Sequence, residues 1–186
     1  EGKLDEAQAL ENEAFALFNK LLNEEHPDPA TLPVRLGNML RRQGRLVEAE
    51  TLFRGNLAMR RKLFGNEHLS VCTALHALSE VLVQQGKLAE AEPLLREALV
   101  TRRKLLGNEH VAVADALNRL AQVLYAQGKL AEAEALQRET LALKRKLLGN
   151  EHPDTVGSVT SLAWVLYAQS KLAEAEHSQA VQAGAP

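Results

Sequence analysis

The chain has 186 residues, a formal net charge of −2 and a single cysteine, Cys72, and aromatic residues make up only 4% of it. The near-neutral charge gives no general attraction to nucleic acid or to an anionic membrane surface. No apolar run approaches the roughly 18 residues that a membrane-spanning helix needs, so we expect no membrane insertion. Helix-forming residues such as Ala, Leu and Glu dominate, which favours an all-helical chain. One cysteine excludes an internal disulfide and fits a reducing, cytoplasmic compartment.

A regular repeat organises the sequence. Gly-Asn-Glu-His begins at Gly65, Gly107 and Gly149, and a glycine followed by a basic residue and Leu recurs with the same spacing at Gly44, Gly86 and Gly128. A fixed period between about 20 and 50 residues indicates a stacked array in which each unit contacts only its neighbours. We therefore predict a single repeat array over residues 1–186, with complete repeats at 23–64, 65–106 and 107–148.

Residues 1–22 match only the second helix of a truncated repeat. Apolar side chains such as Leu10, Phe15 and Leu17 would then lack part of their cover. We expect this N-terminal end to pair with upstream sequence or with another molecule, so self-association through it is one of the predicted interactions.

Each complete repeat is predicted to be a helical hairpin with a tight glycine turn. In the third repeat, a first helix over 111–127 and a second over 130–148 flank Gly128, and Gly107 is the left-handed residue that ends the preceding helix. Apolar residues at spacings of three and four define one buried face on each helix. The predicted buried residues are Val113, Leu117, Leu120, Ala121 and Leu124, then Leu130, Ala133, Leu136, Leu141 and Leu147 or Leu148.

Small residues recur at one position in each helix type. They are Gly37, Ser79, Ala121 and Ala163 in the first helices and Ala7, Ala49, Ala91, Ala133 and Ala175 in the second helices. Small side chains let the paired helices approach closely, and a large residue there would overpack the interface.

Residues 149–186 form a terminal, incomplete repeat. Ser170-Lys171-Leu172 stands where the other repeats have Gly, a basic residue and Leu, and a second helix begins there but loses its leucines, with Ser178 at the place of Leu136. We expect nine helical segments in total, the last one short, with the C-terminal end as a polar cap or a fraying tail.

The pattern resembles the 42-residue tetratricopeptide repeat of kinesin light chains and related proteins. Leu117, Leu120, Ala121 and Leu124, then Gly128, Leu130, Ala133 and Leu141, carry the resemblance, which covers nearly the whole chain. It implies an all-α, right-handed α-α superhelix whose first helices line a concave groove, and a protein or peptide ligand. Kinesin light chains bind acidic peptides that bear an aromatic residue.

Carrying the groove positions over repeat by repeat predicts a peptide-binding surface. We expect arginines to bind carboxylates, asparagines to bind backbone amides and Trp164 to hold an apolar anchor. Packing of Trp164 on the terminal repeat is the alternative. The predicted groove residues are Arg35, Asn38, Arg42, His76, Glu80, Asn118, Arg119, Gln122 and Trp164. With Arg41 added, arginine outnumbers the acidic Glu80 and Asp115, so the groove is predicted to be mildly positive.

Two recurring groups resemble chemical sites but are interpreted structurally. His26, His68, His110 and His152 occur once per repeat in the turn, so we predict a capping role and no metal site. The clusters 60–62, 102–104 and 144–146 end successive second helices, where cations complement the helix dipole; stacked side by side they would also form a basic edge. No phosphate-binding loop or nucleophile–base pair occurs, so we expect no catalysis and no cofactor.

The leading interpretation is thus a protein–protein interaction module. Two alternatives remain open at this point. The array is a structural spacer or assembly subunit that uses its ends and basic edge, or it is a regulatory segment of a larger signalling protein.

Overall fold

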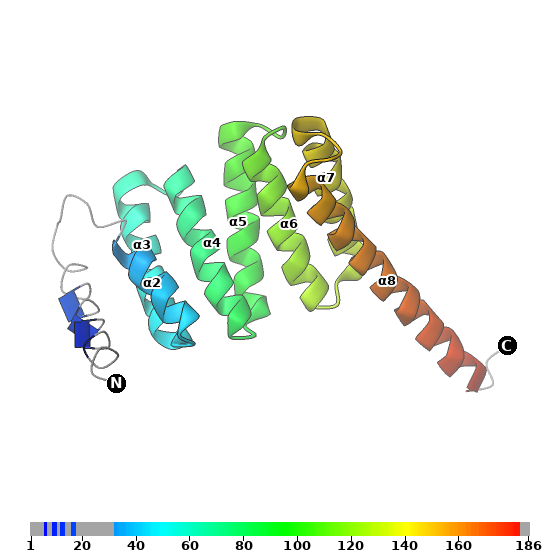
Figure 1. The fold of residues 1–186 in the computed structure, drawn as a ribbon, viewed down its shortest axis with the longest axis horizontal. Helices are drawn as coiled ribbons and strands as arrows, with labels where there is room; N and C mark the ends of the chain where they lie inside the picture. The colour runs from blue at the N-terminus through cyan, green and yellow to red at the C-terminus, as the bar shows by residue number, and fades with distance from the viewer. Residues whose placement is uncertain (1–5, 7–8, 11, 14–15, 18–31, 183–186) are drawn as a thin grey trace. The chain divides into compact units, whose positions relative to one another are not determined.

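A computed structural model describes residues 6, 9, 10, 12, 13, 16, 17 and 32–182 of the chain. All regular structure in these residues is α-helical, which confirms the all-α prediction (Figure 1). The helices are α2 (Leu32–Arg42), α3 (Leu46–Phe64), α4 (Leu69–Gln84), α5 (Leu88–Leu106), α6 (Val111–Ala126), α7 (Leu130–Leu148) and α8 (Pro153–Gln182). The chain divides into two compact units, residues 1–101 and 102–186, which are described separately.

The helix boundaries follow the glycine pattern. The third repeat has its two helices at Val111–Ala126 and Leu130–Leu148, as predicted to within one residue. Gly107, predicted to be left-handed, has a positive φ of 78°. Its equivalent Gly65 ends α3 with φ 75° and ψ 176°, so the ψ there is extended rather than left-handed helical. That region of backbone conformation is essentially restricted to glycine. Glycine at this helix end is therefore more strictly required than at a usual left-handed C-cap.

Unit 1 builds its core from α2, α3, α4 and the first part of α5. Leu40, Leu52, Phe53 and Leu75 are among its fully buried large side chains. Gly37 of α2 lies directly against the ring of Phe53, because a Cβ added at Gly37 would come within 2.7 Å of Phe53 Cζ. The close approach of the paired helices at Gly37 agrees with the predicted need for a small residue there, but the neighbour is the large Phe53, which the sequence did not predict.

Charged side chains join successive second helices of unit 1. Glu50 of α3 accepts from Lys87 Nζ at 2.8 Å and from Arg54 Nε at 2.7 Å, and Arg54 also reaches Glu90 of α5 at 2.9 Å. Arg61 of the first basic cluster binds Glu97 of α5 at 2.7 Å. The pairs with Lys87, Glu90 and Glu97 join groups that are nearly one full repeat apart in the sequence, so they fix the stacking of one repeat on the next.

The recurring histidines cap helices, as predicted. His68, His110 and His152 each accept a backbone N–H two residues later through Nδ1, at 3.0–3.1 Å; His26 lies outside the described residues. The basic clusters do more than face the helix dipole. Arg60 donates to the carbonyl oxygen of Ser70, and Arg102 donates to that of Ala112, so one member of each of the first two clusters binds the start of the next first helix.

Unit 2 contains α6, α7 and α8, in which α7 contacts both of the other helices. Every residue predicted to be buried in α6 is buried. In α7 the prediction is correct for Ala133 and Leu141, whereas Leu130, Leu136 and Leu148 are half-buried and Leu147 is exposed. The buried places of α7 are taken instead by Gln137, Thr140 and Lys144. Because α7 is enclosed from two sides, polar residues that the periodicity assigns to its surface become part of the interior.

The C-terminal hairpin predicted from the repeat is absent. Residues 153–182 form one continuous helix, α8, so the expected break at Ser170 and the count of nine segments are wrong. Gly44, Gly86 and Gly128 turn the chain at this position with φ of 76–78°. Serine disfavours positive φ, and the helix therefore continues through Ser170.

The N-terminal predictions lie largely outside the described residues, among them Phe15 and the small residue Ala7. Of that segment, Leu10 and Leu17 are helical and exposed. Asn12 accepts a hydrogen bond from Arg45 at 3.2 Å. No helix of the described residues is long and apolar enough to cross a membrane.

The contact of Gly37 with Phe53 gives a first prediction. Gly37→Ala is expected to lower the free energy of unfolding by about 1–3 kcal/mol through overpacking. The equivalent positions in the next repeat hold Ser79 and Leu95, so Phe53→Leu should make room for the added methyl group. Urea denaturation of the two single variants and the double variant measures this coupling. Strictly additive effects would show that the two residues do not constrain each other.

The Glu50 carboxylate gives a pH-dependent prediction. Burial raises its pKa, but hydrogen bonds from Lys87, Arg54 and Gln85 outweigh burial and lower the pKa from 4.5 to about 2. The ionised group therefore stabilises the fold above pH 4.5, and this contribution is lost as the pH falls toward 2. Glu50→Gln should cost about 1–3 kcal/mol at pH 7 and progressively less between pH 4.5 and pH 2. Urea titrations over this range test it, with Glu90→Gln as the control, whose exposed pair should contribute less.

Candidate functional site

Unit 2 presents an aromatic pocket on the polar face of its first helices. Trp164 and Tyr167 of α8 are 60% and 56% exposed. Their rings meet edge to face, with centroids 6.2 Å apart and an interplanar angle of 88°. Trp164 also borders a pocket of about 240 Å³ that lies between α6, α7 and α8. The pocket is lined by Ala121, Gln122, Tyr125, Gln137, Ser161, Trp164 and Val165.

Gln137 supplies the buried polar group of this pocket. Its Nε2 donates to Asn118 Oδ1 at 2.9 Å, whereas its Oε1 has no hydrogen-bond partner among the described residues. A buried acceptor without a partner is costly unless water or a ligand satisfies it. The pocket wall therefore includes a buried amide whose oxygen has no partner among the described residues.

An ion pair between a buried lysine and a half-exposed aspartate lies on the same helices. Lys144 of α7 is almost fully buried, and its Nζ lies 3.2 Å from Asp115 Oδ1 of α6. Lys144 occupies the repeat position of Arg60 and Arg102, which bind backbone carbonyls instead. Asp115 is a predicted groove position, so one of the acidic groups there already has a cationic partner.

In unit 1 the predicted groove residues form a charged network. Glu80 of α4 lies 2.9 Å from Arg41 Nη1 and 3.7 Å from His76 Nε2. Arg41 also donates to Asn38 Oδ1 at 3.4 Å. The structure therefore brings Asn38, His76 and Glu80 together through Arg41, and the charge of Arg41 is offset locally by Glu80.

The remaining predicted residues have different surroundings. Arg35 and Arg42 of α2 are exposed, and neither makes an ion pair with a described residue. Arg119 is half-buried on α6, and Gln122 is exposed at the mouth of the aromatic pocket. Asn118, Arg119, Gln122 and Trp164 thus belong to unit 2, and the other five predicted residues belong to unit 1. That the two sets line one groove stays a prediction.

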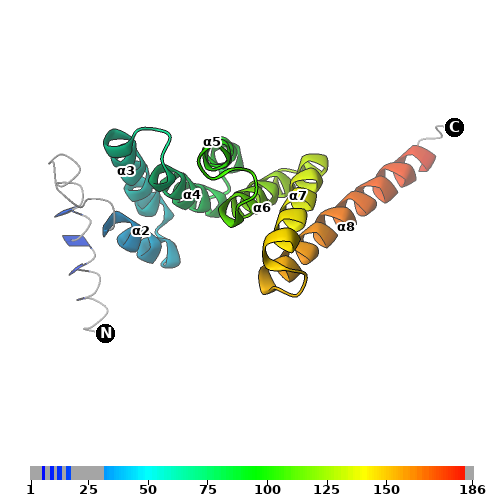
Figure 2. The ribbon, with the colours of Figure 1, turned by 90° about the horizontal axis from the view of Figure 1, so that it is seen from above.

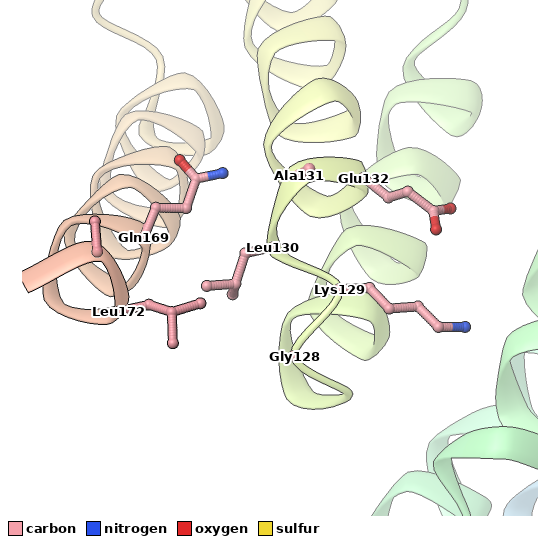
Figure 3. Close-up of a pocket in the computed structure, with 8 residues that line it drawn as sticks. Gly128, Lys129, Leu130, Ala131, Glu132, Gln169 and Leu172 are labelled. Atoms are coloured by element: carbon pink, nitrogen blue, oxygen red, sulfur yellow. The ribbon is translucent and has the colours of Figure 1, made fainter. Parts of the chain in front are cut away.

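A second hollow, of about 440 Å³, lies at the start of α7. Figure 3 shows Leu130 of α7 and Leu172 of α8 facing it from opposite sides, with Gln169 beside them. Lys129 and Glu132 stand on the far side of α7 in that view. The residues that line the hollow include no buried polar group left without a hydrogen-bond partner, so the aromatic pocket is the better candidate for specific recognition.

The side chains at these sites are aromatic rings, amides and ion-paired groups, which suit non-covalent contacts. The described residues contain no group of three or more His, Cys, Asp or Glu side chains that could hold a metal ion. The aromatic rings and the Gln137 acceptor suit an extended chain that carries one large apolar side chain and backbone N–H groups.

Sequence reasoning missed Gln137 and Lys144 because both lie in a second helix, away from the predicted groove helices. The repeat comparison does contain a signal for Gln137. Its position holds Phe53 and Leu95 in the two preceding repeats, and both are buried. Packing alone does not explain a polar residue at a position where two other repeats bury an apolar one, so the position is a candidate for a specific role.

Comparison with known proteins gives a consistent result. The tetratricopeptide repeat family model matches residues 28–104, 70–146 and 112–179. A putative kinesin light chain of Podosopora anserina with nearly identical TPR-like repeats is 28% identical, with a TM-score of 0.77 over 95% of this chain and 83% of that chain. BtubC (BKLC) of P. vanneervenii, at 23% identity, has a TM-score of 0.74 over 94% of this chain and 72% of its own, a likeness of fold. No curated protein sequence matches.

The role of Gln137 generates a prediction about stability. Gln137→Leu restores the residue type of Leu95 and removes a buried oxygen that lacks a partner. We expect the free energy of unfolding to stay unchanged or to rise by up to about 1 kcal/mol. Gln137→Ala is the control and should lower it through a cavity. A clear loss of stability in Gln137→Leu, measured by urea denaturation, would show that the amide oxygen is satisfied in solution.

Proposed function

Because the chain belongs to the tetratricopeptide repeat family and is of the kinesin light chain-like type, we propose that it binds an extended acidic peptide, or the equivalent surface of a partner protein, on its first helices. Tetratricopeptide repeats are in general protein-interaction modules. The peptide class, its placement and the residues that hold it are the parts that we propose here.

The observation that carries the proposal is the aromatic pocket of unit 2. One pocket is lined by exposed Trp164, exposed Tyr125 and buried Gln137, whose Oε1 has no hydrogen-bond partner among the described residues. A large apolar side chain of the peptide would pack on the rings, and a backbone N–H beside it would donate to Gln137. Arg119 on the adjoining helix would bind an acidic residue of the same peptide.

Unit 1 supports the acidic preference in its own way. Arg35 and Arg42 are exposed cations that no described residue neutralises. Asn38 and His76 belong to the network around Glu80, which would order them for contacts to a peptide backbone. With Glu80 offsetting Arg41, the positive character of this helix face comes from Arg35 and Arg42.

This function needs no cofactor, no catalytic group and no nucleic acid. We propose a cytoplasmic setting, in keeping with the single buried thiol, Cys72. A purely structural role that uses the basic ends of the second helices is the competing proposal, and the experiment below separates the two.

Binding of acidic peptides with one aromatic residue is expected at about micromolar affinity, because ordering a flexible peptide offsets much of the contact energy. Trp164→Ala should weaken every such peptide about tenfold or more, and Trp164→Phe should restore part of the loss. Arg119→Ala should weaken acidic peptides far more than neutral ones, and added salt should reduce that difference. Fluorescence anisotropy with labelled peptides gives the affinities.

The matched control is Arg145→Ala. Arg145 is an exposed arginine of unit 2 that lies in the basic cluster at the end of α7. If Arg145→Ala weakens binding while Arg119→Ala and Trp164→Ala do not, the basic edge is the interaction surface and the peptide pocket is rejected. A screen that yields only basic or purely apolar binders leads to the same conclusion.

A further inference from the structure

The first half of α8 has two apolar faces, and only one of them is covered. Val165 is buried in unit 2, whereas Val156, Val159 and Leu166 are 54%, 42% and 38% exposed. Ala163 is exposed on the same face. The equivalent residues of α6 are Ala114, Leu117, Ala121 and Leu124, all fully buried, and those of α4 are Cys72, Leu75, Ser79 and Leu82, all buried as well. A face that the other first helices bury is therefore bare on α8.

The difference arises at Ser170. In the third repeat the chain turns at Gly128 and α7 lies back along α6, joined to it by the Gln137–Asn118 hydrogen bond. In the terminal repeat α8 runs straight on, and its last turns extend past α7 (Figures 1 and 2). The exposed face is thus the one that a second helix would cover.

Residues 171–182 have the sequence of such a second helix at their start. The stretch 171–176 reads Lys-Leu-Ala-Glu-Ala-Glu, and 87–92 and 129–134 are identical to it. In those two repeats the second alanine of this stretch, Ala91 or Ala133, is fully buried. Residues 171–176 therefore match the start of the helices that cover a first helix, although the leucine at the place of Leu136 is replaced by Ser178. In the single copy this segment continues α8 and does not fold back along it.

We propose that two copies of the chain exchange this segment, so that residues 171–182 of each copy cover the exposed face of α8 in the other copy, with the two α8 helices antiparallel. The third repeat supplies the register. In its hairpin Gln137 lies opposite Asn118. The midpoint of these two positions, between residues 127 and 128, is the centre of the hairpin. Shifted by one repeat period, the centre of the exchanged pair falls between residues 169 and 170.

Backbone geometry favours exchange over closure within one copy. An intramolecular hairpin needs a positive φ at residue 170, as at Gly44, Gly86 and Gly128, which serine adopts only at a cost. Two exchanged helices run straight through Ser170 and need no turn. Replacing a turn by a straight hinge is a low-cost route to dimers.

The charges also suit the exchanged arrangement. In unit 1, Lys87 pairs with Glu50 and Arg54 pairs with Glu90 across successive second helices. The equivalent partners two repeats later are Lys171 with Glu134 and Arg138 with Glu174. In the single copy Arg138 pairs with Glu134 at 2.7 Å, as Arg54 does with Glu50, and Lys171 pairs with Glu174 of its own helix at 2.7 Å. A second copy would let them pair across the interface.

Sedimentation velocity over about 5–500 μM tests the proposal with the 186-residue chain. We expect a concentration-dependent monomer–dimer equilibrium. Val159→Glu and Leu166→Glu, which place charges on partly exposed positions of the bare face, should each weaken dimerisation more than tenfold. Val100→Glu, at an exposed position of α5, is the matched control and should leave dimerisation unchanged. A chain that stays monomeric throughout, or a dimer that survives both α8 variants, overturns the proposal.

The hinge residue gives a second, independent measurement. Ser170→Cys places a thiol at the centre of the exchanged pair, four residues after Leu166 on the same face, and should form a disulfide-linked dimer under mild oxidation, whereas buried Cys72 should not react. Ser170→Gly permits the intramolecular turn and disfavours the straight helix, so it should weaken dimerisation about tenfold or more. Absence of the cross-link, or a Ser170→Gly dimer as tight as the original, would contradict an exchange about this hinge.

Discussion

Each helical hairpin of this chain must be covered by its neighbours. A first helix here has two apolar faces, one for the preceding repeat and one for its own second helix, and neither can be left in water without cost. In α6 both faces are fully buried, whereas in α8 only the face toward the preceding repeat is covered. The ion pairs of Glu50 and Arg61 reinforce the same stacking from the outer side. The stability of any one helix therefore depends on the next element that lies along it.

The repeats differ at one pair of facing positions, one on the first helix and one on the second, where the residues vary in size and polarity. Gly37 accommodates the ring of Phe53, and the corresponding pair in the third repeat is Ala121 with Gln137. The first pair preserves an apolar contact. The second places an amide in the interior of unit 2, in the wall of the pocket that Trp164 and Tyr125 also line. The proposed recognition site thus lies where one repeat departs from the packing residue that the two before it use.

Local ion pairs change the charge of the proposed binding surface in a way that a count of charged residues does not capture. Arg41 and Asp115 both stand at predicted groove positions, but each has a partner of opposite charge, Glu80 and Lys144 respectively. Lys144 is nearly buried, so its charge acts mainly on Asp115. The exposed cations that remain on α2 are Arg35 and Arg42. An acidic ligand would therefore meet a few separate arginines rather than a continuous positive groove.

The sequence by itself determined the repeat length, the all-α class, the helix ends at the glycines, the capping histidines and the buried face of α6. Apart from the repeat length, which needs a comparison of successive repeats, these features depend on local rules, namely helical periodicity and the conformational freedom of glycine. Only the tertiary structure decided that Gln137, Thr140 and Lys144 are interior, because burial on α7 depends on being enclosed by two other helices. It also decided that α8 continues through Ser170. The repeat pattern predicts a turn there, whereas serine disfavours the positive φ that the turn needs. Which conformation forms depends on the packing free energy that a second helix would contribute by folding back along the first.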